Sequence, residues 1–340
     1  MREQLHPLSD LNGKPPGTTS WSRSITEAGT DMRSYYGRPI IKEPVWTWEI
    51  PTYFFTGGLA GASAVLATTA KLSGNEELSK KALYIGAVAD LVSPALLISD
   101  LGRPERFHHM LRVVKVTSPM NIGSWVLLVS GGASNTAAVL ELLGRLKPIK
   151  LLAEAVSTLA GPLLATYTGV LVADTAVPVW HDGRRELPWI FGASAMASAG
   201  AAASIFTRPE AAGPARRLAV AGVIAEGALM QLMEARLGTV GEVYREGEAG
   251  TFSRAAKGLA TAGAALLALR GKKSRAALVL GGAMVCAGEM CVRWAVFKAG
   301  VQSARDPKYV VESQRRRVEQ QGSKATTKPG ENPASADRGA

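Results

Sequence analysis

The chain has 340 residues, of which 47% are hydrophobic and 20% are charged, and its formal net charge at pH 7 is +11. The apolar residues gather between residues 50 and 297 in long runs of Ala, Leu, Val and Gly, whereas both flanks are polar. A soluble helix keeps charges on its wet face, so this segregation excludes an ordinary soluble enzyme and a disordered chain. The two cysteines, Cys286 and Cys291, are too few for a disulfide scaffold.

A positive net charge can indicate nucleic-acid binding, but the placement of these charges argues against it. Most of the basic residues lie in short turns between the apolar runs rather than on one face of a helix. Basic turns beside apolar spans are typical of proteins oriented in a bilayer. The expected partner surface is therefore the lipid bilayer, with no nucleic acid.

Eight stretches in chain order are long and apolar enough, or nearly so, to cross about 30 Å of hydrocarbon. They cover residues 50–70, 82–100, 121–140, 151–173, 188–206, 216–235, 255–270 and 275–297. The seventh is short and carries Lys257 near its start, which leaves seven spans as the alternative. We predict an all-α integral membrane protein, a bundle of about eight transmembrane helices, with small residues packing the helices closely.

The domain organisation follows from these spans. Residues 1–45 form a polar N-terminal tail, 46–298 the transmembrane domain, and 299–340 a polar C-terminal tail that is expected to be disordered. An even number of spans places both tails on one side of the membrane. The loops on that side carry nine Lys and Arg residues and the opposite loops about thirteen, which favours both termini outside.

Four ionisable residues lie deep in the apolar runs, where a charge costs a few kcal/mol. Asp90 and Glu226 have no basic neighbour within one helical turn, so they are candidates for a proton path. Glu289 and Arg293 are spaced i, i+4 and can pair on one helix, which gives either a structural contact or a further part of that path. None of the four histidines lies within a span, and no cysteine set is present, so we expect no haem, iron–sulfur cluster or metal site in this chain.

Three stretches are distinctive for a membrane protein: WTWEIPTYFFTGGLAG at 46–61, DLGRPERF at 100–107 followed by SPMNIGSW at 118–125, and SARDPKY at 303–309. Together they resemble the NrfD/PsrC family, the integral-membrane subunits of polysulfide reductase-like complexes, over residues 35–310. The run YYGRP at 35–39 is similar to members that accompany formate dehydrogenase-like enzymes.

The resemblance implies a bundle of eight helices in two four-helix halves, without a redox cofactor of its own. Such a subunit docks a ferredoxin-like iron–sulfur subunit, which contacts a molybdopterin catalytic subunit, and it binds menaquinone or ubiquinone in a bacterial plasma membrane. The chain alone would then not be catalytic, although its complex would be an oxidoreductase.

A quinone site needs hydrogen-bond donors for the carbonyl oxygens and groups that deliver protons. The loop after the second span offers both types, and side chains near the ends of the first and fourth spans lie on the same side of the membrane. The quinone-binding candidates are Glu49, Tyr53, Asp100, Arg103, Arg106, His108, His109, Asp174 and His181. The alternative for this loop is an anchor for lipid headgroups or for the partner subunit.

Two other classes of function remain open at this point. A small-molecule or ion transporter would also use buried carboxyl groups and a bundle of small residues. Transporter helices are often broken at corresponding points of two halves, but Pro94 and Pro162, which interrupt the second and fourth spans, have no clear counterpart in the later spans. A purely structural anchor would not need Asp90 or Glu226.

Overall fold

The computed structural model describes residues 41–311, and these residues form helices connected by loops, with no strand among them. This confirms the prediction of an all-α membrane bundle. The long helices are α2 (Glu49–Leu72), α3 (Glu76–Ser99), α4 (Pro119–Leu143), α5 (Lys147–Ala173), α7 (Leu187–Phe206), α8 (Gly213–Leu237), α9 (Gly247–Leu269) and α10 (Arg275–Arg305). Short helices connect them: η1 (Pro104–Leu111), α6 (Pro178–Asp182) and η2 (Gly238–Tyr244).

Seven of the long helices in the described part of the chain are apolar enough to cross a membrane. The remaining one, α9, contains the expected seventh span and is a regular helix of 23 residues, packed along α10. Glu248, Arg254 and Lys257 occupy its first half and lower its hydropathy. The structure thus supports a multi-pass membrane protein in which seven long helices can cross the bilayer and α9 packs beside them.

Side chains at the helix starts explain several boundaries. The Asn75 side chain accepts a hydrogen bond from the backbone N–H of Leu78 at 3.1 Å, which caps α3, and the Ser274 hydroxyl accepts one from the N–H of Ala277 at 3.3 Å, which caps α10. Ser118 caps α4, and the proline that follows it occupies a first-turn position, where its missing N–H costs nothing.

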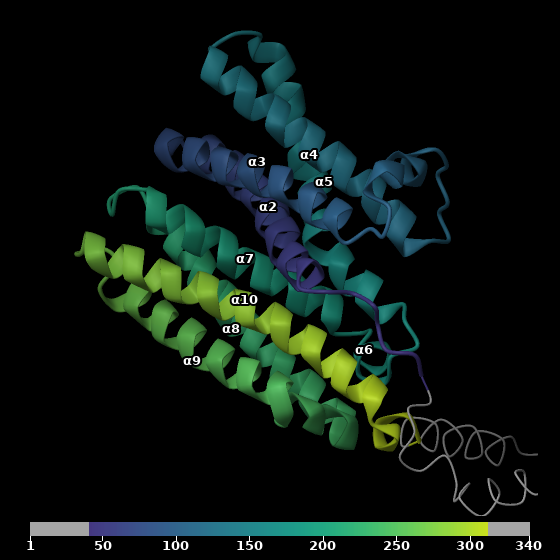
Figure 1. Cartoon of the computed structure of the whole chain (residues 1–340). Coiled ribbons are helices and arrows are strands. Elements are labelled where there is room, and N and C mark those ends of the chain that lie inside the picture. The colour runs from purple at the N-terminus through teal and green to yellow at the C-terminus, as the bar shows by residue number, and fades with distance from the viewer. Residues whose placement is uncertain (1–40, 312–340) are drawn as a thin grey trace, which may run out of the picture. The chain divides into compact units, whose positions relative to one another are not determined.

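The long helices form two sets of four neighbours. Helices α2, α3, α4 and α5 pack against one another, as do α7, α8, α9 and α10, and α7 contacts α2 and α5 across the boundary between the sets. In Figure 1, α8, α9 and α10 run alongside one another, while α4 and α5 pair next to α3. We call the first set the N-half and the second the C-half, in agreement with the two four-helix halves that the family resemblance implies.

Close helix crossings depend on glycine. A Cβ atom on Gly61 of α2 would lie 2.3 Å from the carbonyl oxygen of Gly161 in α5, and one on Gly222 of α8 would lie 2.4 Å from the backbone nitrogen of Ala197 in α7. A side chain at either glycine would therefore push two backbones apart. Lipid gives helices no hydrophobic reason to associate, so this close packing holds the bundle together.

A network of ion pairs ties the four helices of the N-half together where they meet the short loops. Lys150 pairs with both Glu141 and Glu154, Lys80 lies 2.9 Å from Glu141, and Lys71 pairs with Glu154. These five side chains come from α2, α3, α4 and α5. The carboxylate of Glu154, which the sequence places near a span end, is therefore neutralised by two lysines.

The other end of the bundle, which we call the terminal end, holds the loops 100–118, 174–186 and 238–246 together with the ends of the described chain. Glu43 and Arg305, from these two ends, form an ion pair at 2.9 Å. The helix α10 continues to Arg305, beyond the boundary expected at residue 298. Residues 1–40 and 312–340, which make up most of the two expected tails, lie outside the described residues.

Candidate functional site

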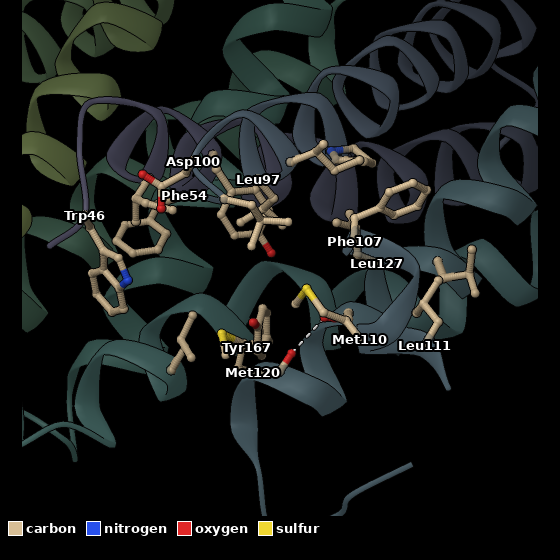
Figure 2. Close-up of a pocket in the computed structure, with 18 residues that line it drawn as sticks. Trp46, Phe54, Leu97, Asp100, Phe107, Met110, Leu111, Met120, Leu127 and Tyr167 are labelled. Atoms are coloured by element: carbon tan, nitrogen blue, oxygen red, sulfur yellow. Dashed lines mark hydrogen bonds between the residues drawn. The ribbon is translucent and has the colours of Figure 1, made fainter. Parts of the chain in front are cut away.

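A cavity of about 210 Å³ lies at the terminal end of the N-half. This volume is far above the roughly 15 Å³ that one water molecule needs. Its walls come from the first turns of α2, the last turns of α3, the loop with η1, the start of α4 and the end of α5. The lining residues are Trp46, Ile50, Tyr53, Phe54, Pro94, Leu97, Ile98, Asp100, Leu101, Phe107, Met110, Leu111, Met120, Ser124, Leu127, Leu128, Tyr167 and Leu171. Figure 2 shows Trp46 and Leu111 at opposite ends of the cavity.

Two tyrosines supply most of the polar character inside this apolar lining. The Tyr53 side chain is 1% exposed, and its hydroxyl group makes no hydrogen bond of normal geometry, although it interacts electrostatically with Tyr167. Tyr167 fits beside α4 because position 123 is a glycine: a Cβ there would lie 1.7 Å from Cζ of the Tyr167 ring. The sequence thus places a buried phenol group on α2 and a half-buried one on α5, and both line the same cavity.

Asp100 lines the cavity and fixes the segment that enters α2. Its Oδ1 atom accepts hydrogen bonds from the Thr47 hydroxyl at 3.0 Å and from the Thr47 backbone N–H at 3.4 Å. The Thr47 hydroxyl also contacts the carboxylate of Glu49, so it lies between two acidic groups. Trp46 directly precedes Thr47 in the chain, so the hydrogen bonds from Thr47 to Asp100 at the end of α3 determine where the Trp46 indole ring can lie.

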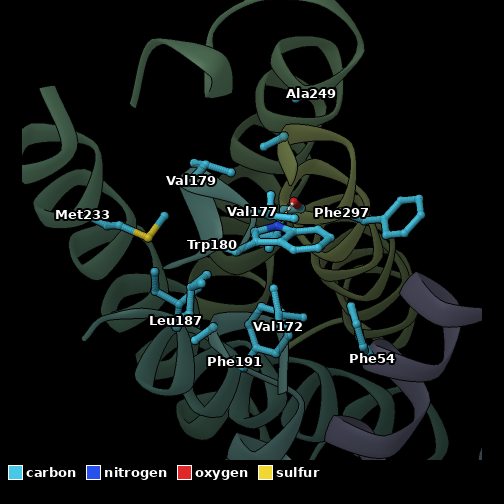
Figure 3. Packing of buried hydrophobic residues seen from close by; sticks show 14 of the residues in the cluster. Phe54, Val172, Val177, Val179, Trp180, Leu187, Phe191, Met233, Ala249 and Phe297 are labelled. Atoms are coloured by element: carbon cyan, nitrogen blue, oxygen red, sulfur yellow. Dashed lines mark hydrogen bonds between the residues drawn. The ribbon is translucent and has the colours of Figure 1, made fainter. Parts of the chain in front are cut away.

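The C-half supports the same indole. Trp46 stacks on Trp180 of α6 with 5.8 Å between the ring centroids, and it packs edge-on against Phe54 at 6.5 Å. Trp180 is fully buried and donates a hydrogen bond from Nε1 to the carbonyl oxygen of Val296 in α10 at 2.8 Å. Figure 3 shows Trp180 within its cluster of apolar side chains, which includes Val177, Val179 and Phe297. The Trp46 wall of the cavity is thus held in place by residues that pack against the C-half.

This arrangement fits a flat, largely apolar ring that carries hydrogen-bond acceptors. Binding sites for small cofactors are mostly apolar, with a few converging polar groups that orient the ligand. Here the Tyr53 hydroxyl is buried without a hydrogen-bond partner of normal geometry, and burial of such a donor costs free energy unless a ligand or water accepts from it. Quinone carbonyl oxygens are acceptors of the required kind.

Of the nine quinone-binding candidates from the sequence, the structure places Tyr53 and Asp100 at the cavity. Seven others do not line it. Arg103, Arg106, His108, His109 and Asp174 are exposed, His181 of α6 is half-buried, and Glu49 contacts Thr47 at the start of α2. The loop after α3 contributes Phe107, Met110 and Leu111 instead, because these three apolar side chains turn toward the cavity and the charged side chains turn away.

Sequence analysis did not assign Tyr167 or Trp46 to the site. Tyr167 stands as an isolated aromatic residue in an apolar run, and only the three-dimensional packing brings it opposite Gly123 and Tyr53. Trp46 belongs to an aromatic cluster that is also typical of a headgroup interface. A lone tyrosine within the last turns of the fourth apolar run is the signal that could have identified Tyr167.

Asp90, the first proton-path candidate, is buried in α3 close to the cavity. It is 2% exposed, and its Oδ2 atom accepts a hydrogen bond from the Ser134 hydroxyl in α4. Four residues later, Pro94 lines the cavity and lacks the N–H that would normally bond to the Asp90 carbonyl oxygen. Asp90 thus lies one helical turn before a residue of the cavity wall.

The other three proton-path candidates form a separate buried group in the C-half. Arg293 interacts electrostatically with Glu226 and Glu289, and all three side chains are at most 6% exposed. Arg293 does not form the i, i+4 ion pair expected with Glu289. Its guanidinium group instead turns to α7, where Nη2 donates to the carbonyl oxygen of Phe191 at 2.8 Å and the group lies 3.9 Å from the centre of that ring.

Metal ligation has no support within residues 41–311, where no group of three or more His, Cys, Asp or Glu residues could hold an ion.

In a comparison with known families, the family model described as polysulfide reductase, of the NrfD type, matches residues 32–306. A search of curated proteins found no match. Proteins of the NrfD type are membrane subunits of quinone-linked oxidoreductases, and in general they accompany iron–sulfur and molybdenum subunits. Since the match covers most of the chain, this protein belongs to the NrfD polysulfide reductase family.

Proposed function

We propose that this chain binds a membrane quinone in the cavity of the N-half and exchanges electrons between that quinone and an iron–sulfur partner subunit. The observation that carries the proposal is the pair of phenol groups, Tyr53 and Tyr167, in an otherwise apolar cavity at the terminal end. The family assignment supports the same class of ligand. Menaquinone and ubiquinone both present the ring and carbonyl groups that this cavity suits.

Some residues around the cavity orient the quinone ring, and others supply protons to it. A bound quinone supplies two-electron, two-proton redox chemistry. The Tyr53 hydroxyl donates a hydrogen bond to a carbonyl oxygen, and the Trp46 indole and the apolar lining hold the ring and exclude water. Asp90 holds a proton behind Tyr53 and restores the proton that the Tyr53 hydroxyl gives up, while Ser134 orients the Asp90 carboxyl group.

We further propose that Glu226 and Glu289 hold and pass protons in the C-half, with the permanent charge of Arg293 beside them as part of the same proton path. Their burial and mutual interaction support this role, since an uncompensated charge at this depth is expensive and is retained mainly at functional sites. Glu226→Gln and Glu289→Gln variants that kept full quinone-linked turnover and the wild-type proton stoichiometry would remove these residues from the mechanism.

The electrons come from, or go to, other subunits. The proposed partners are a ferredoxin-like iron–sulfur subunit docked at the terminal end, near the cavity, and a molybdopterin catalytic subunit beyond it. The YYGRP motif at 35–39 favours a formate dehydrogenase-like complex over a polysulfide reductase. The whole assembly would lie in the plasma membrane of a bacterium, and the chain by itself would not catalyse a reaction.

The test is purification of the full chain in mild detergent with its co-purifying proteins, followed by extraction and quantification of quinone. Tyr53→Phe should lower quinone affinity about fivefold, the equivalent of one hydrogen bond of about 1 kcal/mol. Tyr84→Phe is the matched control, because Tyr84 lies in α3 and packs with the core cluster away from the cavity. Recovery of the wild-type chain with neither quinone nor an iron–sulfur partner would favour a transporter.

A further inference from the structure

The loop between α3 and α4, residues 103–116, differs from the other two connections at the terminal end. Its valines are exposed: Val113 by 65%, Val114 by 64% and Val116 by 75%. The valines of the other two connections, Val177, Val179, Val240 and Val243, are at most 5% exposed. A run of branched aliphatic side chains held outward is unusual at a water-facing surface, where apolar residues normally occur singly.

The charged residues of the same loop are mostly basic and unpaired among the described residues. Arg103, Arg106, Arg112 and Lys115 are exposed, and within residues 41–311 none of them has an ion-pair partner, against a single acidic residue, Glu105. In the neighbouring connections two acidic residues pair with basic ones, although Arg184 and Arg185 of the 174–186 connection form no ion pair within the described part of the chain either. Glu186 holds Arg236 at 2.5 Å, and Glu242 holds Lys308 at 2.9 Å. The loop therefore presents a surplus of positive charge together with its aliphatic side chains.

Hydrogen bonds to α4 hold the loop in this orientation. The Asn121 side-chain amide donates to the carbonyl oxygen of Met110 at 2.7 Å, and its Oδ1 atom accepts from the backbone N–H of Lys115 at 2.7 Å. The Trp125 indole donates to the carbonyl oxygen of Val113 at 3.4 Å. Met110 and its neighbour Leu111 face the cavity, whereas the valine and basic side chains of the loop are exposed on its outer face.

The outer face continues the lipid-facing surface of the bundle. Leu128 and Val129 in α4 are each 47% exposed, and Leu91 in α3 is 63% exposed, as expected for spanning helices that contact acyl chains. Cations interleaved with exposed aliphatic residues beside such helices match an interfacial segment, in which the basic groups meet anionic headgroups.

We propose that residues 103–116 lie in the headgroup layer and bind anionic phospholipid, with Val113, Val114 and Val116 at the acyl boundary and Arg106, Arg112 and Lys115 on the lipid phosphates. This proposal does not rest on the quinone site. The same segment forms the outer wall of the cavity. Lipid that binds to it therefore affects the positions of Phe107, Met110 and Leu111, so these positions depend on the lipid composition of the leaflet.

A spin label at Val114→Cys tests the location of the loop. The full chain, with Cys286 and Cys291 replaced by alanine, is reconstituted with its co-purifying proteins into phosphatidylcholine vesicles containing phosphatidylglycerol. The label should collide more often with dissolved oxygen, which concentrates in lipid, than with a water-soluble nickel chelate. A label at Arg185→Cys, in the exposed part of the 174–186 connection, is the control and should show the opposite preference.

Lipid selectivity tests the charged half of the proposal. The Arg112→Gln/Lys115→Gln variant should retain fewer phosphatidylglycerol molecules than the wild type, as counted by native mass spectrometry. The control variant Lys272→Gln/Lys273→Gln is changed at the opposite end of the bundle and should leave the collision preference of the label at position 114 unchanged. A nickel preference at position 114, or equal phosphatidylglycerol retention by R112Q/K115Q and wild type, would overturn the proposal. Protection of the label from both collision partners would show that a protein subunit covers the loop instead.

Discussion

The indole rings of Trp46 and Trp180 stack at 5.8 Å with 25° between their planes, although one precedes the first helix of the N-half and the other lies in α6, against the C-half. Trp180 is fixed by its hydrogen bond to Val296. A wall of the proposed quinone cavity is therefore positioned by a helix, α10, that contributes no lining residue itself. Changes in α10 should alter the cavity at a distance.

Gly300→Ala tests this coupling. A Cβ at position 300 would lie 2.0 Å from two atoms of the Trp180 ring, so the indole has to move, and Trp46 loses its stacking partner. We expect a loss of about 1–3 kcal/mol in stability, typical of overpacking, and a raised KM for quinone with a smaller effect on kcat. Thermal unfolding in detergent and quinone-linked turnover measure the two effects.

The matched control is Gly258→Ala in α9, where the added Cβ meets no atom within 4 Å. Replacing a helical glycine by alanine at such a position should leave the protein as stable as the wild type or slightly more so. An unchanged KM in G300A would show that Trp46 is held by Asp100 and Phe54 alone.

Gly123→Ala tests the placement of Tyr167. The new Cβ would overlap the phenol ring, at 1.7 Å from Cζ and 2.0 Å from the hydroxyl oxygen, so Tyr167 must leave its position beside α4. Quinone affinity should fall by at least the fivefold expected for one lost hydrogen bond. Binding is measured by titration of the purified protein with a soluble short-chain quinone.

Gly132→Ala lies in the same helix and meets no atom within 4 Å, which makes it the comparison for G123A. Equal quinone affinities for the two variants would exclude Tyr167 from the binding site.

Asp100 is predicted to act by position rather than by charge. Asp100→Asn keeps the Oδ1 acceptor for both Thr47 hydrogen bonds, so its quinone KM and its stability should stay close to those of the wild type. Asp100→Ala removes the acceptor and should cost about 1 kcal/mol and raise the KM. If D100N loses activity as fully as D100A, the negative charge itself is required.

Arg293→Gln should be among the most destabilising single changes in the C-half. It removes the hydrogen bond to Phe191 and the cation over that ring, and it leaves Glu226 and Glu289 buried without a compensating positive charge. The expected cost is about 3–5 kcal/mol. Chemical denaturation of the purified chain measures it.

A double variant separates the charge from the packing. Arg293→Gln combined with Glu289→Gln removes both charges, so it should recover part of the lost stability. An additive loss in the double variant would mean that Glu289 and Arg293 do not interact.

The sequence predicted the architecture well because long apolar runs, proline in first turns and basic turns are local signals. Seven of the eight expected spans correspond to helices that can cross a membrane, and the remaining one, α9, forms with charged residues in its first half. Two of the predicted quinone-binding residues, Tyr53 and Asp100, lie within distinctive motifs at the ends of two helices and line the cavity.

The remaining features depend on contacts between distant segments. No local pattern shows that Arg103 and His108 turn away from the cavity while Phe107 and Met110 line it, because that choice follows from how Asn121 and Trp125 hold the loop backbone. Arg293 is a similar case. Its spacing from Glu289 favoured a pair on one helix, but the Phe191 carbonyl and ring on α7 offered a better partner.

Photo-crosslinking with an azido-quinone, followed by mass mapping of the labelled peptides of the full complex, tests the central claim most directly. The account predicts label on segments 46–54, 94–101, 120–128 and 167–171, and its loss when an excess of unmodified quinone competes. Label confined to the C-half, between residues 187 and 305, would place the quinone elsewhere and contradict the account.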